Sequence, residues 1–205
     1  MSNSKVSASG HTLWNKIPKA NTELFALTYG SLVTELIRDY GESNISEINN
    51  QLESIGHSIG GRCIDELFAK SELNGIYLPS CSNLRDTAEV VAKVGFRMFL
   101  GMNAEVANFR TDGRGFSLFL YDNPLSLFVE LPSNSEGIDE GGTDWSQLKY
   151  SNIYCGVIRG ALEQVNMKVT CEFVKDVLKG DEVNEIRVEL KEVMTDGAGD
   201  DYKEE

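Results

Sequence analysis

Cys81 stands immediately before the start of a predicted helix, where a thiol can become a nucleophile. Ser82 or Asn83 is a suitable N-cap, and Asp86 lies three residues after Asn83, so that this pair can close a capping box. The unpaired backbone N–H groups and the dipole at a helix N-terminus stabilise a thiolate and lower its pKa. These residues alone leave two interpretations open: a reactive thiol, or a half-buried structural cysteine.

Other residues that could bind a metal or activate a nucleophile are few. The four cysteines and two histidines of the chain are Cys63, Cys81, Cys155, Cys171, His11 and His57. The cysteines form no CxxC pair, so we expect neither a zinc site nor a disulfide. A Cys–His nucleophile pair would have to use His57, which lies in a helical pattern beside small residues. The sequence therefore predicts no metal, no cofactor and no catalytic centre.

Composition and charge restrict the class of protein. A chain of 205 residues with 41% hydrophobic and 25% charged residues is typical of one soluble globular domain. No apolar run approaches the roughly 20 residues of a membrane span, and no secretory or lipidation signal marks either end, which favours a cytoplasmic protein. The net charge of −13 argues against nucleic acid or anionic lipid as a partner through bulk charge. A local basic face on the folded surface stays open.

The elements that position these groups begin with helices. We expect residues 1–20 to be a flexible segment, after which Asn21 or Thr22 caps a long helix. Leu24 and Leu27 add a second apolar flank to this helix. A helix that is apolar on more than one side needs cover from its own core and from a partner.

Glycines interrupt the next two helical patterns. Gly56, Gly60 and Gly61 fall in the second long pattern, where they either let another backbone approach closely or mark a kink. Gly95 falls inside the apolar face of the helix that follows Cys81. Its missing side chain indicates either close packing or space for a ligand.

Strands dominate the second half of the chain. "EVANFRTDGRGFSLFLYDNP" reads as two strands joined by a turn at Asp112–Gly113, and residues 133–147 read as a disordered loop. After a helix that begins near Ile153, alternation over 169–173 and 186–190 predicts two more antiparallel strands. Helices first and strand pairs later indicate an α+β domain.

Several long segments resemble one family. "ELFALTYGSLVTELIRDY", "TAEVVAKVGFRMFLG", "FSLFLYDNPLSLFVELP" and "YSNIYCGVIRGALEQV" followed by "KGDEVNEIRV" are similar to the Bet-three type (subunit three) of the Bet/Trs family of transport protein particle (TRAPP) subunits. The resemblance covers residues 21–195. It implies a single domain with a layer of helices packed on an antiparallel β-sheet and an internal apolar channel.

The resemblance also implies a lipid site. Cys81 matches the family cysteine that carries a covalently attached fatty acyl group, such as palmitoyl, inside the channel. The expected channel residues are Val91, Val94, Gly95 and Met98. The residue before this cysteine is basic in the family, whereas Ser80 stands here.

The partners implied by the resemblance are proteins and a membrane. Related TRAPP subunits would bind through the first two helices, with Leu24, Leu27, Leu32 and Leu36 at the interface. The assembled complex would tether vesicles and promote nucleotide exchange on a Ypt/Rab GTPase in ER-to-Golgi transport, peripherally on cis-Golgi and ER–Golgi membranes. The chain itself would be non-catalytic.

The acidic tail at 196–205 has two interpretations. The family implies that the carboxy terminus helps to open the nucleotide site of the GTPase, with Asp196, Asp200 and Asp201 in contact, while charge patterning alone is equally typical of a solubilising tail. Two further functions stay open for the chain as a whole. It could bind or sense a lipid-like small molecule in the same channel, or act as a thiol acyltransferase.

Overall fold

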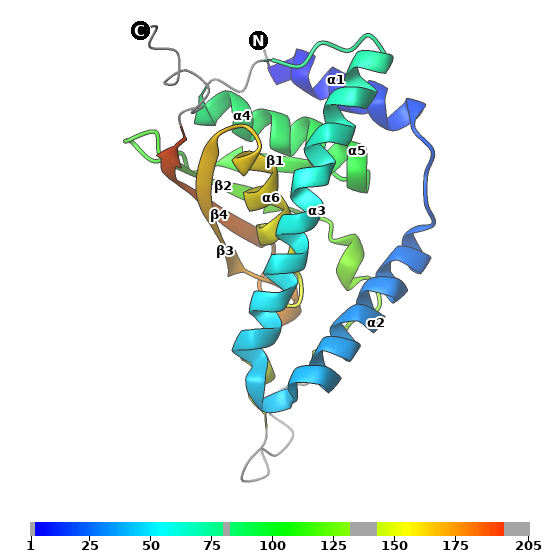
Figure 1. Cartoon of the computed structure of the whole chain (residues 1–205), viewed down its shortest axis with the longest axis vertical. Coiled ribbons are helices and arrows are strands. Elements are labelled where there is room, and N and C mark those ends of the chain that lie inside the picture. The colour runs from blue at the N-terminus through cyan, green and yellow to red at the C-terminus, as the bar shows by residue number, and fades with distance from the viewer. Residues whose placement is uncertain (1–2, 80–82, 132–142, 195–205) are drawn as a thin grey trace, which may run out of the picture.

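Helices and a four-stranded sheet form the described part of the chain, which in this computed structural model comprises residues 3–79, 83–131 and 143–194 (Figure 1). The helical elements are α1 (Asn3–Lys16), α2 (Thr22–Tyr40), η1 (Glu42–Asn44), α3 (Ile45–Leu73), α4 (Leu84–Val90), the π-helical η2 (Val91–Gly95), α5 (Phe96–Leu100), η3 (Pro124–Ser126), η4 (Trp145–Gln147), α6 (Ile153–Glu163) and η5 (Val177–Lys179). The strands are β1 (Ala104–Ala107), β2 (Gly115–Leu120), β3 (Met167–Lys175) and β4 (Asn184–Val193).

The sheet is antiparallel throughout, in the order β1-β2-β4-β3. The predicted turn between the first two strands is present: the Arg110 backbone N–H donates to the Gly115 carbonyl at 2.8 Å, and Gly113 takes a positive φ of 69°. Phe116 and Leu118 of β2 and their partners Val188 and Ile186 of β4 are buried on one face of the sheet. This face of the sheet packs against the helices, which confirms the predicted α+β fold with a helical layer on an antiparallel sheet (Figure 1).

Helices α3 and α6 approach each other closely through glycines on both partners. A Cβ atom on Gly56 or Gly60 would overlap a carbonyl oxygen of α6, and a Cβ atom on Gly156 or Gly160 would overlap a carbonyl oxygen of α3. Helix α3 is continuous from Ile45 to Leu73. Of the two readings, close approach of another backbone therefore applies to Gly56 and Gly60, whereas a Cβ atom on Gly61 would meet only the Gln164 side chain at 3.7 Å.

Residues 3–16 form α1 instead of the flexible segment that we expect from the sequence. Val6 and Leu13 of α1 are buried in a second apolar cluster with Val94 and Met98. Gly10 lies against the carbonyl oxygen of Lys93, so closely that a Cβ atom there would overlap it. Packing against this apolar surface stabilises α1. The serine-rich sequence of the segment gives no local sign of that packing.

The loop expected to be disordered at 133–147 is ordered at its end. Residues 133–142 lie outside the described residues, whereas Trp145–Gln147 form η4 and Leu148 is buried at 2% exposure. The Asp144 carboxylate accepts a hydrogen bond from the backbone N–H of Ser146 at 3.1 Å and so caps this turn. The Asp144 cap and the burial of Leu148 order this end of the loop in spite of its polar composition.

Two predicted helix caps are present. The Asn21 carboxamide oxygen accepts from the backbone N–H of Leu24 at 2.7 Å at the start of α2. At the start of α4, Asn83 accepts from the backbone N–H of Asp86 at 2.8 Å and donates to the Asp86 carboxylate at 2.8 Å. Asn21 and Asn83 are thus the N-caps among the residues proposed for each helix.

Candidate functional site

An apolar cavity of about 590 Å³ lies between the helices. This volume is within the usual range of small-molecule sites, roughly 300–1,000 Å³. Four walls surround it, contributed by α2, α3, the α4–η2–α5 run and α6. Its lining residues include Phe25, Thr28, Tyr29, Leu32, Ile59, Cys63, Ile64, Leu67, Phe68, Leu78, Pro79, Thr87, Val90, Val91, Gly95, Phe96, Phe99, Leu100, Leu125, Ile153, Tyr154, Val157, Ile158, Ala161, Leu162 and Val165.

The hydroxyl groups of the cavity wall are already used within the protein. Thr28 donates to the Leu24 carbonyl at 2.7 Å, and Thr87 donates to the Asn83 carbonyl at 2.8 Å. Tyr29 donates to the Tyr150 carbonyl, and Tyr154 donates to the Asn123 carboxamide at 3.2 Å. The wall therefore presents carbon to its contents, which suits a hydrocarbon chain better than a polar ligand.

The residues predicted for a channel separate into two pairs. Val91 and Gly95 line the cavity. Val94 and Met98, at 0% and 2% exposure, face α1 in the second apolar cluster instead. The sequence prediction is therefore wrong about the direction of Val94 and Met98.

The run from α4 to α5 is apolar on two sides because two different surfaces cover it. One side faces the cavity and the other faces α1, so apolar residues occur on two sides of the helix. Because residues 1–20 are expected to be flexible, the sequence pattern predicts one apolar face where the structure has two. The π-helical turn at Val91–Gly95 lies where the run borders both surfaces, and such turns occur often at functional sites.

Cys81 lies outside the described residues, but the chain on both sides of it borders the cavity. Leu78 and Pro79 precede it, Thr87 and Val90 follow it, and all four line the wall. The N-cap at Asn83 is in place, so the helix N-terminus that the sequence argument requires exists.

The described thiols are kept protonated by burial. Burial raises the pKa of the Cys155 thiol to about 12, with a further contribution from the Glu53 carboxylate. Burial also raises the pKa of Cys171 and of Cys63, the latter lining the cavity. Because the thiolate is the nucleophile, these three cysteines are poor acyl acceptors.

The four leucines expected at a partner interface take different positions on α2. Leu24 and Leu27 are 65% and 57% exposed. Leu32 is half-buried and lines the cavity, and Leu36 is 9% exposed in the main core. Only Leu24 and Leu27 are thus available to a partner, since tertiary packing covers the other flank of the helix.

Helix α3 also contributes to the cavity wall, which the sequence pattern did not predict. Ile59, Cys63 and Phe68 line it from this helix. A signal was present, since Ile59 and Cys63 are four residues apart on one face of a helix.

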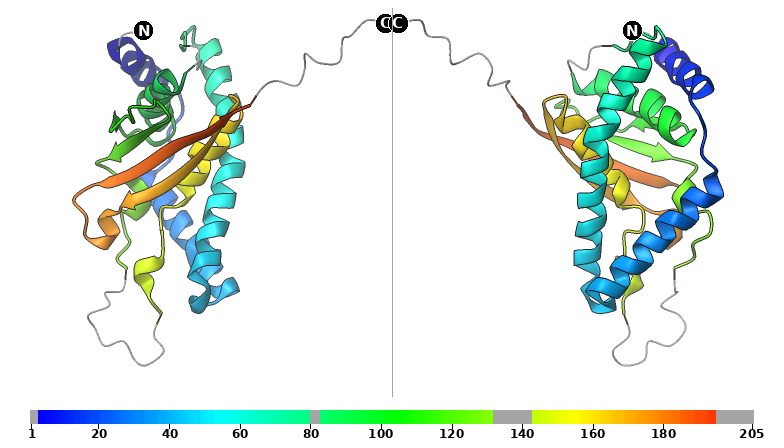
Figure 2. Two further views of the ribbon diagram at one scale, coloured as in Figure 1. Left: turned by 90° about the vertical axis from the view of Figure 1, so that its left-hand side faces the viewer. Right: turned by 45° about the vertical axis from the view of Figure 1, so that its right-hand side comes forward.

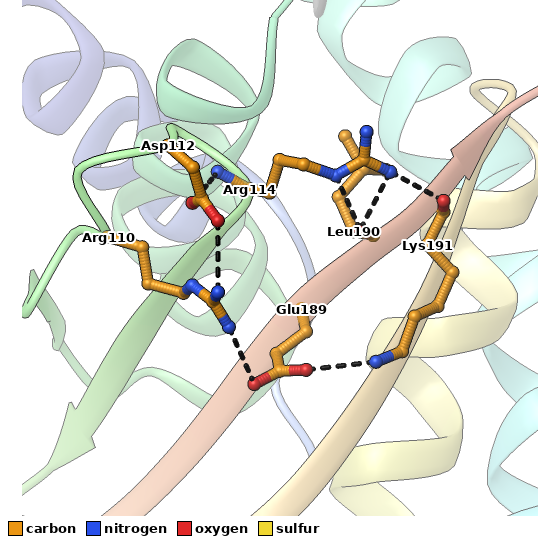
Figure 3. A network of polar contacts seen from close by, with 6 residues as sticks. All are labelled: Arg110, Asp112, Arg114, Glu189, Leu190 and Lys191. Carbon is orange, nitrogen blue, oxygen red and sulfur yellow. Dashed lines mark hydrogen bonds and ion pairs between the residues drawn. The ribbon is translucent and has the colours of Figure 1, made fainter.

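A polar network fixes the end of β4 beside the β1–β2 turn (Figure 3). Arg110 pairs with Asp112 at 2.9 Å and with Glu189 at 3.3 Å, and Arg114 donates to the Leu190 carbonyl at 3.2 Å. The backbone N–H of Arg114, followed by the charge of Arg110, lowers the pKa of the Asp112 carboxyl. The turn therefore holds the last residues of β4 in place.

The predicted GTPase-contacting residues of the tail, Asp196, Asp200 and Asp201, lie outside the described residues.

Neither a membrane-spanning helix nor a metal-binding cluster is present in the part of the chain that the structure describes. Across 3–79, 83–131 and 143–194, no helix is both long and apolar enough to cross a membrane. Within the same ranges, no group of three or more His, Cys, Asp or Glu side chains is placed to hold a metal ion.

The fold and the site together define an α+β protein whose helices line an apolar cavity and pack on an antiparallel sheet. The family model for the transport protein particle (TRAPP) component matches residues 25–189, and the chain belongs to this family. The resemblance inferred from the sequence is thereby confirmed. By family, the chain is a trafficking-complex subunit.

Curated relatives and a solved structure agree with this assignment. The chain is 49% identical to trafficking protein particle complex subunit 3 of Dictyostelium discoideum, over 91% of this chain and 92% of that protein. It is 44% identical to transport protein particle subunit bet3 of Schizosaccharomyces pombe, over 95% of each. A crystal structure of a trafficking protein particle complex subunit 3 from Naegleria fowleri, covalently bound to palmitic acid, matches with a TM-score of 0.74 and 47% identity, over 86% of this chain and 98% of that one.

Proposed function

We propose that this chain is a non-catalytic core subunit of a vesicle-tethering complex, and that its cavity holds a fatty acyl chain attached through a thioester to Cys81. The observation that carries the proposal is the carbon-lined cavity of about 590 Å³, with the chain on both sides of Cys81 forming part of its wall. The similar Naegleria protein that is covalently bound to palmitic acid supports the identity of the ligand.

The free energy of burial favours an acyl chain in this site. Burying a methylene group stabilises by about 0.8 kcal/mol, so a sixteen-carbon chain removed entirely from water gains on the order of 10 kcal/mol. A large empty cavity lowers protein stability, because its lining loses contacts. The acyl chain supplies those contacts and acts as part of the core.

The chemistry of attachment needs only a thiolate and an acyl thioester. The Cys81 sulfur attacks the carbonyl carbon of an acyl-CoA, a new thioester forms, and the CoA thiolate leaves and takes up a proton. A helix N-terminus favours the attacking thiolate, while the described cysteines are held as thiols by burial. This difference makes Cys81 the preferred acceptor.

Intact-mass measurement of the purified chain tests the acyl site. We expect a mass increase of one palmitoyl-type group that is lost on hydroxylamine treatment and absent from Cys81→Ser. Cys63→Ser is the matched control, since it removes a thiol that lines the cavity and should leave the adduct unchanged. An unmodified Cys81 together with a ligand released by denaturation would favour the alternative, a lipid-like small-molecule binding or sensing protein. Turnover of acyl-CoA beyond one equivalent would favour a thiol acyltransferase.

For the complex, we propose that the chain binds related TRAPP subunits through α2. The support is the pair Leu24 and Leu27, which are large, apolar and mostly exposed on one helix. Through this assembly the complex would promote nucleotide exchange on a Ypt/Rab GTPase in ER-to-Golgi transport, in the cytoplasm at cis-Golgi and ER–Golgi membranes. Purification from native extract followed by identification of the bound subunits tests this part, and recovery of the chain without any related subunit would refute it.

A further inference from the structure

A second groove lies beside α2, on a different side of this helix from the acyl cavity. Helix α2 is on the outside of the molecule, next to the segment that follows β2 (Figures 1 and 2). Between α2 and residues 128–131 lies a groove of about 580 Å³, whose lining includes the buried residues Leu148 and Tyr150. Below, this groove is called the α2 groove. Among the described residues, none lines both the α2 groove and the acyl cavity, so an acyl chain does not account for it.

The Tyr150 side chain brings an unpartnered hydroxyl group to the α2 groove. Tyr150 is 4% exposed, and its hydroxyl oxygen is buried without a hydrogen-bond partner among the described residues. The hydroxyls of Ser31 and Thr34, which also line the groove, donate to backbone carbonyls of α2 at 3.0 Å and 2.9 Å. A buried hydroxyl without a partner is unfavourable, because folding removes the water that it binds in the unfolded chain. The chain therefore keeps a hydrogen-bond donor here that its own described residues do not use.

The Tyr150 hydroxyl lies directly beneath Gly30 of α2. A Cβ atom at Gly30 would meet the Tyr150 hydroxyl oxygen at 3.4 Å, and no other atom outside its own stretch of α2 within 4 Å. The backbone of Tyr150 is held in place, because the Tyr29 hydroxyl donates to its carbonyl. The missing side chain at Gly30 leaves a gap in the cover of the ring. A small movement of the ring toward this gap brings the hydroxyl to the surface of the groove.

The charge around the α2 groove restricts the group that can accept from this hydroxyl. The charged side chains that line the groove, Glu35 and Glu130, are both acidic. Arg38 pairs with Glu35 at 2.7 Å but does not line the groove. A carboxylate would meet like charge here, which disfavours it. The acceptor that fits is therefore a neutral oxygen, from an amide or a hydroxyl group.

We propose that the Tyr150 hydroxyl is a specificity-determining group of the α2 interface, and that a related TRAPP subunit inserts a neutral oxygen acceptor to receive its hydrogen bond. The inference rests on the proposed binding of related subunits through α2, and it adds the chemistry that such a partner must carry. Leu27 connects the two sites, since it is 57% exposed beside Leu24 and also lines the α2 groove. That continuity favours the subunit bound at Leu24 and Leu27 as the occupant.

The hydroxyl favours one partner over another because it is already without water in the free chain. A partner with a matching acceptor gains the hydrogen bond with no further desolvation of Tyr150, whereas a partner with an apolar group at this point gains nothing from it. Once a matched partner is bound, removing the donor leaves the acceptor of that partner buried and unsatisfied. Such a loss corresponds to roughly 5- to 150-fold in affinity.

Titration of a related subunit against Tyr150→Phe tests the proposal. The probe is the TRAPP-family subunit that co-purifies with the parent chain, expressed separately and titrated by calorimetry against the full chain. We expect Tyr150→Phe to bind it about 5- to 150-fold more weakly. The urea midpoint of the isolated variant should not fall, since the hydroxyl has no described partner in the free chain. Tyr121→Phe is the matched control: its hydroxyl donates to Glu105 outside the groove, and binding should be unchanged.

Gly30→Ala separates the hydroxyl contact from helix stability. Alanine is the better residue in a helix interior, so this variant should have a higher urea midpoint than the parent chain. Its Cβ atom covers the Tyr150 hydroxyl, so binding of the subunit should nevertheless weaken. The double variant Gly30→Ala/Tyr150→Phe should bind no more weakly than the weaker single variant, because both changes remove the same contact.

The possible outcomes distinguish this inference from the proposed interface. Unchanged affinity of Tyr150→Phe, in a chain that still loses the subunit through Leu24→Glu, overturns the inference and leaves the interface standing. Unchanged binding after Leu24→Glu refutes the interface itself. A lower urea midpoint for Tyr150→Phe would mean that water or the chain already satisfies the hydroxyl, which also overturns the inference. Loss of self-association without loss of the related subunit would assign the α2 groove to a second copy of the chain instead.

Discussion

Replacing Gly95 by leucine tests whether the cavity is open space. A Cβ atom at Gly95 meets only the Val90 carbonyl oxygen, at 3.9 Å, which is ordinary contact. The residue has helical φ and ψ of −59° and −62°, so a side chain adds no backbone strain. Because Gly95 lines the cavity, the leucine side chain should extend into it.

In the chain without an acyl group, Gly95→Leu makes two favourable contributions to the free energy of unfolding. Gly→Leu raises helix propensity by about 0.8 kcal/mol. Burying the leucine side chain in apolar space contributes about 1.5–3 kcal/mol in its own right. We therefore expect a gain of about 2–4 kcal/mol in the free energy of unfolding, which for a chain of this size raises Tm by about 5–15 °C. A densely packed site would instead lose about 1–3 kcal/mol through overpacking.

The assay compares urea unfolding in the Cys81→Ser background with acyl occupancy in the Cys81 background. Gly95→Ala is the matched control, since it supplies the propensity gain of about 1 kcal/mol without filling the cavity. Gly95→Leu should be more stable than Gly95→Ala and should carry less acyl adduct by intact mass. A Gly95→Leu chain that is less stable than the parent and fully acylated would refute the cavity as the acyl site.

Four further predictions follow from the same geometry. Gly60→Ala should cost about 3 kcal/mol in urea unfolding, because its Cβ would overlap the Val157 carbonyl oxygen; a loss below 1 kcal/mol would contradict the close packing. Leu24→Glu should abolish binding of related subunits in co-purification, yet change the unfolding free energy of the isolated chain by less than about 0.5 kcal/mol. Burial acts to raise the pKa of Glu185, but hydrogen bonds from the Ser117 hydroxyl and the Lys175 ammonium outweigh burial and lower this pKa below the ordinary 4.5. The ionised Glu185 therefore stabilises the fold fully above pH 4.5, and this stabilisation is lost as pH falls through the lowered pKa. Glu185→Gln should accordingly destabilise the chain above pH 4.5 and have no effect at the acidic end. Truncation after Val193 should leave assembly intact and slow GDP release from the GTPase, and an unchanged exchange rate would identify the tail as a solubilising segment.

Local features were readable from the sequence because their causes are local. The caps at Asn21 and Asn83 depend on a side chain bonding a backbone group three residues away. The turn at Asp112–Gly113 depends on a glycine that takes a positive φ. Alternation along β3 and β4 depends on one buried face. Each pattern is complete within a few residues, so no other part of the chain is needed to interpret it.

The resemblance to the TRAPP family supplied what local patterns could not, namely the helical layer on the sheet. Composition and periodicity reached the α+β class but gave no order of strands. The pairing β1-β2-β4-β3 joins segments about seventy residues apart, such as Ser117 and Arg187. Such contacts have no signature within either strand.

Whether a face is covered was decided only by the tertiary structure. Residues 3–16 carry few apolar side chains and read as flexible, yet Gly10 lets their backbone settle on η2. Once α1 covers that side, Val94 and Met98 become core residues, and the cavity is left to Val91 and Gly95. Leu32 and Leu36 on α2, which were expected at a partner interface, are likewise covered by neighbouring elements of the same chain. The sequence shows which side chains are apolar and are therefore buried on folding. Which surface buries each of them depends on segments that are distant in the sequence and meet only in the folded chain.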